Sequence, residues 1–346
     1  MHGASFGKRS ELHRSAATVS EPVLSVRDLV IGFPTRRGML TAVDTISFDI
    51  AAGEVLGVVG ESGAGKSLTG AAVIGLLEPP GRIIAGSVHL KGNRIDDLEP
   101  EAMRQLRGRR IGMVFQDPLT SLNPLYRIGD QIVETIRTHA NVSTATAWER
   151  AIELLQEVGI QGARTRINAY PHEFSGGMRQ RVVLALALCA DPDLLIADEP
   201  TTALDVSIQA QIIALIKRLC RQRGTSVMLI THDMGVIAET ADRVAVMYAG
   251  RIAEIGPVRD VVGQPHHPYT RGLMGAIPSA EAAPSARLTQ IPGAMPRLSA
   301  IPPGCAFNPR CPHVFDRCKV QRPEPMPAGS SRAACWLVAQ GAGARL

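Results

Sequence analysis

Residues 60–67 read GESGAGKS and fit the pattern G-x-x-x-x-G-K-[ST], whose residue types suit the binding of phosphate groups. The glycines let the backbone wrap closely around phosphates, and the loop N–H groups donate to them together with the N-terminus of a following helix. The lysine supplies a positive charge to the β- and γ-phosphates, and the serine offers a hydroxyl to Mg²⁺. The sequence therefore predicts a mononucleotide site built from Gly60, Glu61, Ser62, Gly63, Ala64, Gly65, Lys66 and Ser67.

A pair of acids ends the apolar segment LLIADEP at residues 194–200. Asp198 has the oxygen ligands that Mg²⁺ prefers and can hold the ion directly or through water. Glu199 comes one position later, where the alternation of a strand changes direction, and is placed to polarise an attacking water as a general base. The alternative is that Asp198 and Glu199 are simply two exposed acids at the end of a strand. The presence of a phosphate-binding loop in the same chain makes this alternative less favoured.

The segment FSGGMRQR at residues 174–181 contains a second candidate anion site, because Ser175, Gly176 and Gly177 precede a helical stretch. One chain seldom needs two phosphate-binding helix ends for one nucleotide. A two-fold dimer in which each serine-glycine helix closes over the partner chain's loop would explain both ends and enclose two ATP molecules. An ordinary N-cap turn is the alternative for this segment.

The elements that must position these residues alternate between strand and helix. Short apolar runs predict strands, and periodic apolar stripes predict helices, including most of the stretch from 127 to about 160. The alternation predicts an α/β fold with a largely parallel sheet, whose ligands bind beyond the carboxyl ends of the strands. The predicted strands are 23–31, 54–60, 110–116, 194–198 and 226–233, and the predicted flanking helices are 66–77 and 206–220.

In these residues the chain resembles the ATPase subunits of ABC transporters. GESGAGKS is similar to the Walker A motif, LLIADE to Walker B, and FSGGMRQ to the family signature, with Phe174 and Met178 as departures from it. The resemblance implies a P-loop NTPase fold in which a RecA-like core carries a helical and an antiparallel β subdomain. It also implies ATP and Mg²⁺ as cofactors and ATP hydrolysis as the activity, with Glu199 as a catalytic residue.

Further roles come from the same resemblance. Gln116 in FQDP matches the Q-loop glutamine, which touches Mg²⁺ and the water, and Asp205 in TALD matches the D-loop aspartate, which couples the two sites of a dimer. His232 in THD matches the switch histidine, which contacts the γ-phosphate and is counted with the catalytic residues. Phe33 is the candidate for the aromatic residue that stacks on adenine, although a lone phenylalanine is more often part of a core.

Two further segments, 117–134 and 264–278, resemble ATPases of the oligopeptide, dipeptide and nickel importers. The resemblance implies import of di- or oligopeptides at the cytoplasmic face of the bacterial inner membrane, as a peripheral subunit. Its partners would be a second, related ATPase, two membrane permeases and an extracytoplasmic binding protein. Nickel chelates, glutathione and opines remain alternative cargoes, and a soluble ABC ATPase of translation or DNA repair remains an alternative machine.

Composition narrows the functional class of the chain. Of 346 residues, 4% are aromatic and the net charge is +5 with scattered basic residues, so neither a base-stacking surface nor a nucleic-acid stripe is predicted. The longest clean apolar run, residues 182–190, is far shorter than the roughly 20 residues that cross a bilayer. The polar start of the chain does not resemble an export signal, so we expect a reducing cytoplasm, where disulfides are improbable.

Four of the six cysteines gather near the end of the chain, spaced C-x5-C-x6-C-x16-C. Four thiolates suit tetrahedral zinc, an iron–sulfur cluster or a regulatory metal-binding module, and thiols that hold no metal would fit the same spacing. The resemblance to peptide-importer ATPases implies a [4Fe-4S] cluster, with Zn²⁺ as the alternative, and Cys189 and Cys220 are predicted to be buried core thiols. The predicted ligands of the metal are Cys305, Cys311, Cys318 and Cys335.

Changes in amino-acid composition along the sequence divide the chain into three predicted regions. Residues 1–20 form a flexible polar leader, residues 21–260 the ATPase domain, and residues 261–346 a proline-rich appendage that carries the four cysteines. The helical subdomain is expected at about 118–190. The appendage has few periodic apolar segments that could form a core of its own, so we favour a structural role for the cysteine site, in which it cross-links this region. Redox regulation of transport is the alternative role.

Overall fold

The computed structural model describes residues 21–117, 121–202, 204–276 and 290–341. The predicted leader lies outside these ranges, as do residues 118–120 of the segment 117–134 and Ala203 of the TALD motif. Within these ranges, no helix combines the length and the apolar character that crossing a membrane requires.

An eight-stranded sheet in the order β11-β12-β10-β9-β3-β8-β7-β6 forms the centre of the molecule. Its strands from β9 to β6 are parallel, as the sequence predicted, and the remaining three add antiparallel pairs at one edge. Every residue of β3, β7 and β8 is buried, which explains their unbroken apolar runs. The parallel strands are β3 (Val55–Val59), β6 (Ile111–Val114), β7 (Leu194–Asp198), β8 (Ser226–Ile230) and β9 (Arg243–Tyr248).

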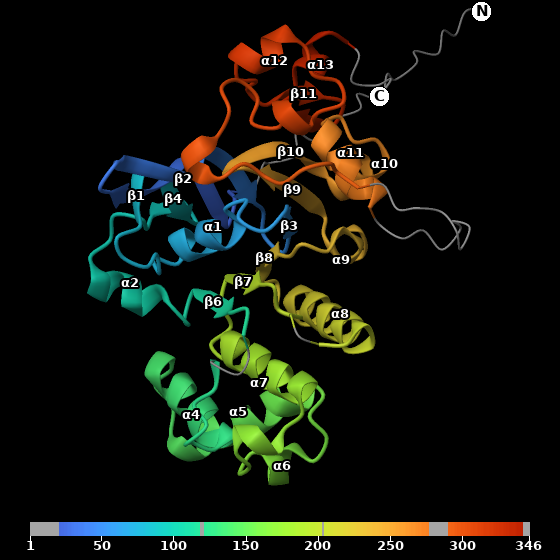
Figure 1. The fold of residues 1–346 in the computed structure, drawn as a ribbon. Helices are drawn as coiled ribbons and strands as arrows, with labels where there is room; N and C mark the ends of the chain where they lie inside the picture. Colours follow the sequence, from blue (N-terminus) through green and yellow to red (C-terminus); the bar gives the residue numbers. More distant parts are fainter. Residues whose placement is uncertain (1–20, 118–120, 203, 277–289, 342–346) are drawn as a thin grey trace, which may run out of the picture.

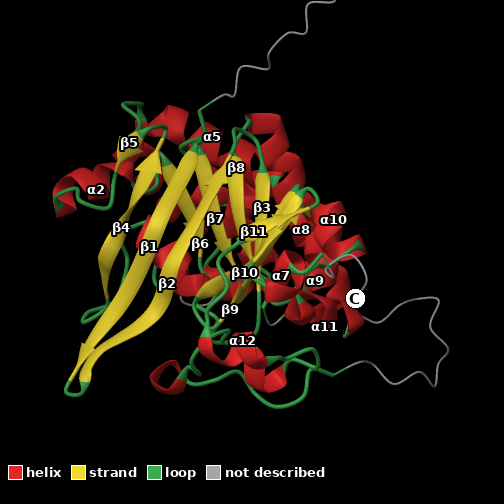
Figure 2. Ribbon diagram, turned by 90° about the horizontal axis from the view of Figure 1, so that it is seen from above, coloured by secondary structure: helices red, strands yellow, loops and turns green. Residues whose placement is uncertain are grey.

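A second, four-stranded sheet has the order β2-β1-β4-β5 and is antiparallel throughout. Figure 2 shows β1 and β2 as a long hairpin at the side of the main sheet. Its inward residues join buried residues of β3 and α1 in one apolar core, which fixes the P-loop against this sheet. The elements are β1 (Leu24–Thr35), β2 (Gly38–Ile50), β4 (Arg82–Leu90), β5 (Asn93–Arg94) and the short helix α2 (Pro100–Leu106) that follows them.

Three helices lie beside the main sheet: α1 (Lys66–Val73), α8 (Val206–Arg223) and α9 (Met234–Thr240). Helix α1 is shorter than the predicted range 66–77. Gly75 has a φ of +65°, and the N–H of Leu76 donates to the carbonyl oxygen of Ala71 over 2.8 Å, so a left-handed cap ends the helix there. Helix α8 extends three residues beyond its predicted end and stops at Gly224, which is also left-handed.

The helices between β6 and β7 in the sequence form a separate helical part, which lies below these two strands in Figure 1. The predicted helical stretch divides into two helices, because the chain is extended at Ala140 and Ser143 then caps the second of them. Ile132 and Ile136 of α4 and Ala151 and Leu155 of α5 are buried at helical spacing in the apolar core of this part. The elements are α4 (Ile128–His139), α5 (Thr144–Glu157), α6 (Ala163–Arg166), the 3₁₀ turn η1 (Pro171–Glu173) and α7 (Gly176–Leu188).

The segment after residue 250 adds to the main sheet. Strand β12 pairs with β10, and Figure 1 draws the later elements over β9 and β10. Buried Glu254 of β10 accepts the N–H groups of His266 and His267 at 2.9 and 3.0 Å, which holds the start of the appendage on the sheet. The elements are β10 (Arg251–Pro257), α10 (Val258–Gly263), α11 (Pro268–Gly275), η2 (Leu298–Ala300), η3 (Asn308–Arg310), α12 (Asp316–Val320), β11 (Met326–Ala328), β12 (Ser331–Ala333) and α13 (Trp336–Ala339).

Candidate nucleotide site

The loop of residues 60–67 joins β3 to α1 and takes a conformation that glycine allows. Gly60, Gly63 and Gly65 have φ values of +152°, +82° and +100°. A Cβ at Gly60 would lie 2.2 Å from the carbonyl oxygen of Met247, so this position also has no room for a side chain. The loop thus brings consecutive N–H groups and the N-terminus of α1 together, as the phosphate-binding motif predicts.

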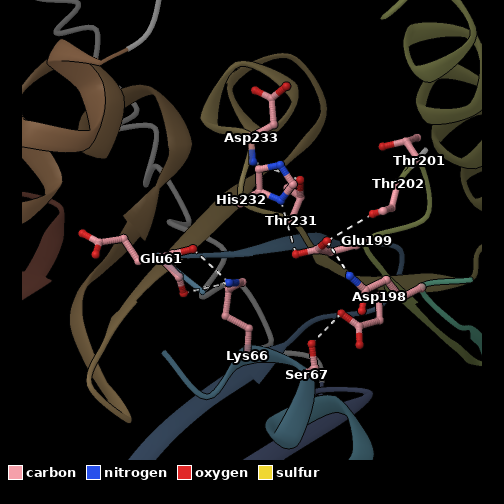
Figure 3. A network of polar contacts seen from close by, with 12 residues as sticks. Glu61, Lys66, Ser67, Asp198, Glu199, Thr201, Thr202, Thr231, His232 and Asp233 are labelled. Atoms are coloured by element: carbon pink, nitrogen blue, oxygen red, sulfur yellow. Dashed lines mark hydrogen bonds and ion pairs between the residues drawn. The ribbon is translucent and has the colours of Figure 1, made fainter. Parts of the chain in front are cut away.

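Lys66 is nearly buried, with 5% of its surface exposed. Its ammonium donates to the carbonyl oxygens of Gly60 and Glu61 over 2.9 and 3.1 Å (Figure 3). Burial lowers the pKa of Lys66, while the carboxylates of Glu199, Asp198 and Glu61 oppose that shift. The amine therefore lies inside its own loop, where its charge is available to phosphate groups.

Ser67 and Asp198 face each other across the end of the parallel sheet. The serine hydroxyl donates to Asp198 Oδ1 over 3.0 Å, and the aspartate is 7% exposed (Figure 3). Burial raises the pKa of Asp198, the hydrogen bond from Ser67 and the charge of Lys66 lower it, and the charge of Glu199 raises it further. A hydroxyl and a carboxylate in contact are oxygen ligands of the kind that Mg²⁺ takes in nucleotide sites.

Glu199 follows β7 and has a left-handed φ of +44°, which turns its side chain out of the strand. Its N–H donates to the carbonyl oxygen of Ile230 over 2.9 Å. Gln116 Nε2 and the Thr202 hydroxyl donate to Oε2 over 3.0 and 3.1 Å, and His232 Nδ1 lies 3.3 Å from Oε1 (Figure 3).

These partners hold Glu199 in its ionised form. Burial alone would raise the pKa of its carboxyl group, but the hydrogen bonds from His232 and Thr202 and the nearby positive charges outweigh burial and lower it. The carboxylate is thus fixed in position and able to accept a proton from a water molecule.

Ser175, Asp205 and Phe33, which the sequence also singled out, make contacts outside this cluster. Ser175 caps α7, and its hydroxyl accepts the N–H of Met178 over 3.4 Å; Figure 1 shows α7 well away from α1. Asp205 is exposed and caps α8, accepting the N–H of Ile208 over 2.9 Å. Phe33 of β1 is half-buried against Gly81. Within one chain, the cluster around Lys66 and Glu199 therefore forms without the serine-glycine segment.

Sequence reasoning missed three residues that touch this site. Thr202 donates to the candidate base, and its place three residues after Glu199 was a signal that could have been used. Tyr269 and Arg310 of the appendage both contact Glu61 of the loop. Neither lies in a nucleotide motif, so the sequence offers no comparable signal for them.

The four cysteines of the appendage line one small cavity together with His267, Phe307 and Trp336. Burial raises the pKa of the Cys305 thiol to about 11 and that of the Cys335 thiol to about 12, and it also raises the pKa of Cys311. In the described part of the chain, no three His, Cys, Asp or Glu side chains are arranged so that they could hold a metal ion.

Cys189 and Cys220 are both 1% exposed in the apolar core, which confirms the prediction that they are core thiols. Burial raises the pKa of each to about 12.

Comparison with known proteins identifies two family models along the chain. The model for "ABC transporter" matches residues 43–202, and that for "Oligopeptide/dipeptide transporter, C-terminal region" matches residues 253–318. The oligopeptide transport ATP-binding protein OppD of Escherichia coli K12 is 49% identical over 304 residues, 88% of this chain and 90% of that protein. The dipeptide transport ATP-binding protein DppD of Bacillus subtilis 168 is 47% identical over 319 residues, 92% and 95% of the two chains.

Solved structures of ATP-binding cassettes resemble the larger part of this fold. The ATP-binding cassette MJ0796, solved as a dimer in a post-hydrolysis state bound to ADP and Pi, aligns with a TM-score of 0.61 and 26% identity over 68% of this chain and 99% of that one. CbiO1 of Clostridium perfringens, part of the ABC transporter complex cbiONQ, aligns with a TM-score of 0.62 and 26% identity over 70% and 92% of the two chains.

Proposed function

The chain belongs to the family of oligopeptide and dipeptide transport ATP-binding proteins, and from this membership we propose how its residues drive import. It is an ABC ATPase subunit that powers peptide import with ATP. Permeases of the same importer are its partners in the membrane. The observation that carries the residue assignment is the cluster in which Lys66, Ser67, Asp198 and Glu199 meet at the carboxyl end of the sheet.

Within this cluster each side chain has one role. The loop N–H groups and Lys66 bind the phosphates of ATP, while Ser67, Asp198 and Gln116 surround the Mg²⁺ position. Glu199 accepts the proton of the attacking water, and its hydrogen bonds to Gln116, Thr202 and His232 keep it oriented for that step. His232 is 68% exposed in its side chain and can turn toward the γ-phosphate, and Phe33 stacks on adenine.

The second half of each site comes from a partner chain. Figure 1 shows helix α7 well away from α1 of the same chain, so we assign the N-terminal end of α7, at Ser175, Gly176 and Gly177, to the nucleotide of a related ATPase subunit, in a heterodimer. Asp205, at the exposed start of α8, couples the two sites. The solved dimer of MJ0796 with ADP and Pi supports a two-chain arrangement. ATP adds contacts that exist when the subunits close, so binding favours closure and hydrolysis reverses it.

A groove of 590 Å³ beside Gln116 is the surface that we assign to the permease. It lies between β6 and the helices α4 and α7 and is lined by Met113, Phe115, Val183 and Leu186, among others. Phe115 keeps 45% of its surface exposed although it is aromatic. Because Gln116 directly follows Phe115, a permease segment seated here would sense the nucleotide site. In this proposal the subunit works at the cytoplasmic face of the inner membrane, below two permeases that a binding protein supplies with peptide.

For the appendage we propose a [4Fe-4S] cluster held by Cys305, Cys311, Cys318 and Cys335. Its support is that four thiols, the donor type that such a cluster takes, line one cavity, although the described side chains are not arranged as a metal-binding group. The group would cross-link a segment that has little core of its own. Burial raises the pKa of Cys305, Cys311 and Cys335, so binding of the cluster would have to drive the loss of their protons. The thiols would also have to draw together. Zinc is the alternative occupant.

Metal analysis after anaerobic purification tests this assignment. We expect iron and sulfide in equal amounts in the wild-type chain and in Cys220→Ser, and loss of both in Cys318→Ser. Stoichiometric zinc without iron would refute the cluster.

The ATPase assignment is tested by Glu199→Gln, with Glu153→Gln on the exposed face of α5 as the matched control. We expect Glu199→Gln to bind MgATP normally but to hydrolyse it at least about 100-fold more slowly, the lower range for loss of a general base. Its dimers with the partner subunit should accumulate in the closed form. Turnover by Glu199→Gln equal to that of the control would contradict the assignment.

A further inference from the structure

Glu61, the second residue of the phosphate-binding loop, has each of its polar groups engaged. Its N–H donates to the Tyr269 hydroxyl over 2.9 Å, and both carboxylate oxygens lie 3.0 Å from Arg310 Nη1. Its carbonyl oxygen accepts from Lys66 Nζ over 3.1 Å and from the N–H of Ala64 over 3.2 Å. Glu61 thus contacts the appendage through its N–H group and its carboxylate, and it contacts Lys66 through its carbonyl oxygen.

Arg310 is held by contacts on several sides. Its side chain is 7% exposed, its Nε donates to the carbonyl oxygen of Pro292 over 2.9 Å, and its Nη1 also reaches the Tyr248 hydroxyl over 3.3 Å. The guanidinium lies over the rings of Tyr248 and Phe307, with distances of 5.8 and 5.9 Å to their centres. A planar cation with this many contacts has little conformational freedom left and can impose its position on Glu61.

The segment that carries Arg310 is part of the cysteine region. Arg310 directly precedes Cys311 and ends the 3₁₀ turn η3. Cys305 anchors that turn, because its carbonyl oxygen accepts the N–H of Asn308 over 2.9 Å, and its own N–H donates to the carbonyl oxygen of Cys318 over 2.8 Å. A further contact lies nearby, where the methyl group of Met295 is 3.1 Å from the position of a Cβ on Gly63. The appendage therefore meets the loop at residues 61 and 63.

We propose that Arg310 is a positioning residue for ATP binding, which acts through Glu61 and makes the affinity of the loop depend on the order of the cysteine region. The inference rests on the proposed ATP site. Arg310 neutralises the carboxylate of a residue in the phosphate-binding loop, and it fixes the backbone whose carbonyl group accepts the hydrogen bond from Lys66. Without Arg310, the negative charge of Glu61 would be unpaired and half-buried in the loop that binds the triphosphate, and the loop would lose one anchor.

Binding of MgATP to the full chain, measured by calorimetry together with KM and kcat, tests the proposal. We expect Arg310→Gln to weaken MgATP binding about tenfold, the effect of leaving one partly buried charge without its partner, and to raise KM with little change in kcat. Arg310→Lys, which keeps the charge but cannot form the same set of contacts, should fall between this variant and the wild type. The control is Arg297→Gln, an exposed arginine of the same appendage, which should bind MgATP as the wild type does.

A double-mutant cycle shows whether the effect passes through Glu61. In a Glu61→Gln background, Arg310→Gln should weaken binding by no more than about threefold, because no unpaired carboxylate remains. The double variant also keeps the test open if Arg310→Gln alone does not fold, since it replaces the ion pair with two neutral side chains. A tenfold loss in that background would overturn the proposal, because Arg310 would then act by another route.

Two further outcomes separate this proposal from the one on which it rests. A wild-type chain that binds MgATP, combined with a folded Arg310→Gln variant of unchanged affinity, would overturn the role of Arg310 and leave the ATP site standing. A wild-type chain that does not bind MgATP would overturn both.

Discussion

The nucleotide site and the cysteine site are built in opposite ways. The side chains of the candidate nucleotide site follow buried strands of the main sheet, and Ser67 and Asp198 contact each other there. The cysteines lie on short turns of a proline-rich segment, and their thiols share a cavity without forming a group that could hold a metal ion, as far as the chain is described. A rigid sheet can present a ready site, whereas the appendage depends on anchors to the ATPase core and gains most from a cross-link.

The largest effect is expected at the nucleotide site itself. Replacing Lys66 with alanine removes the buried ammonium that we assign to the phosphates, so ATP hydrolysis should fall at least about 100-fold, as when one preorganised charge-stabilising group is removed. The control is Arg164→Ala on α6, whose exposed ion pair with Glu149 lies in the helical part, away from both sites (Figure 1). Iron content should be the same in both variants. Loss of iron in Lys66→Ala alone would break the distinction between the two sites.

A smaller effect is expected at Thr202, which holds the candidate base without touching the phosphates. In Thr202→Val one hydrogen bond to Glu199 is lost, and kcat should fall about three- to tenfold, which corresponds to roughly 1 kcal/mol. The pH profile of kcat gives the more specific readout. Since that hydrogen bond lowers the pKa of Glu199, its loss raises the pKa, and the fall of activity on the acid side should shift to higher pH. An unshifted acid limb would contradict the role of Thr202.

The smallest effect on ATP is expected from the cysteine site. Cys318→Ser should lower the free energy of unfolding by about 1–3 kcal/mol through loss of the cross-link and of a buried contact. Through Arg310 it should also weaken MgATP binding roughly two- to fivefold, since a less ordered appendage holds the loop less firmly. Cys220→Ser, a core thiol remote from both sites, should leave MgATP binding unchanged. Equal MgATP binding in the two variants would show that the cysteine site does not reach the loop.

Much of the nucleotide site could be predicted because its residues lie in short motifs attached to strongly apolar elements. GESGAGKS and LLIADEP each specify a strand end and the polar groups that follow it, and the parallel sheet brings Ser67 and Asp198 together as expected. The early end of α1 was less visible, because Leu76 and Leu77 continue the apolar pattern past Gly75, which stops the helix.

The contacts of the appendage could not be predicted for a different physical reason. Arg310 and Glu61 are 249 residues apart in the sequence, and an ion pair leaves no periodic signal in either segment. Strands β11 and β12 have three residues each, which is too short for an alternating pattern to be recognised. The gathering of the cysteines was visible from composition and resemblance, whereas their attachment to the loop depends on how the chain returns to the sheet through β10 and β12.

The central claim is that hydrolysis at the cluster of Lys66, Asp198 and Glu199 powers peptide import. Its most direct test is uptake of a labelled oligopeptide into vesicles that contain this subunit, its partner ATPase, the permeases and the binding protein. We predict uptake that requires MgATP with the wild-type chain and with Glu153→Gln, and no sustained uptake with Glu199→Gln. Uptake by Glu199→Gln at the wild-type rate, or wild-type uptake that does not need ATP, would contradict the claim.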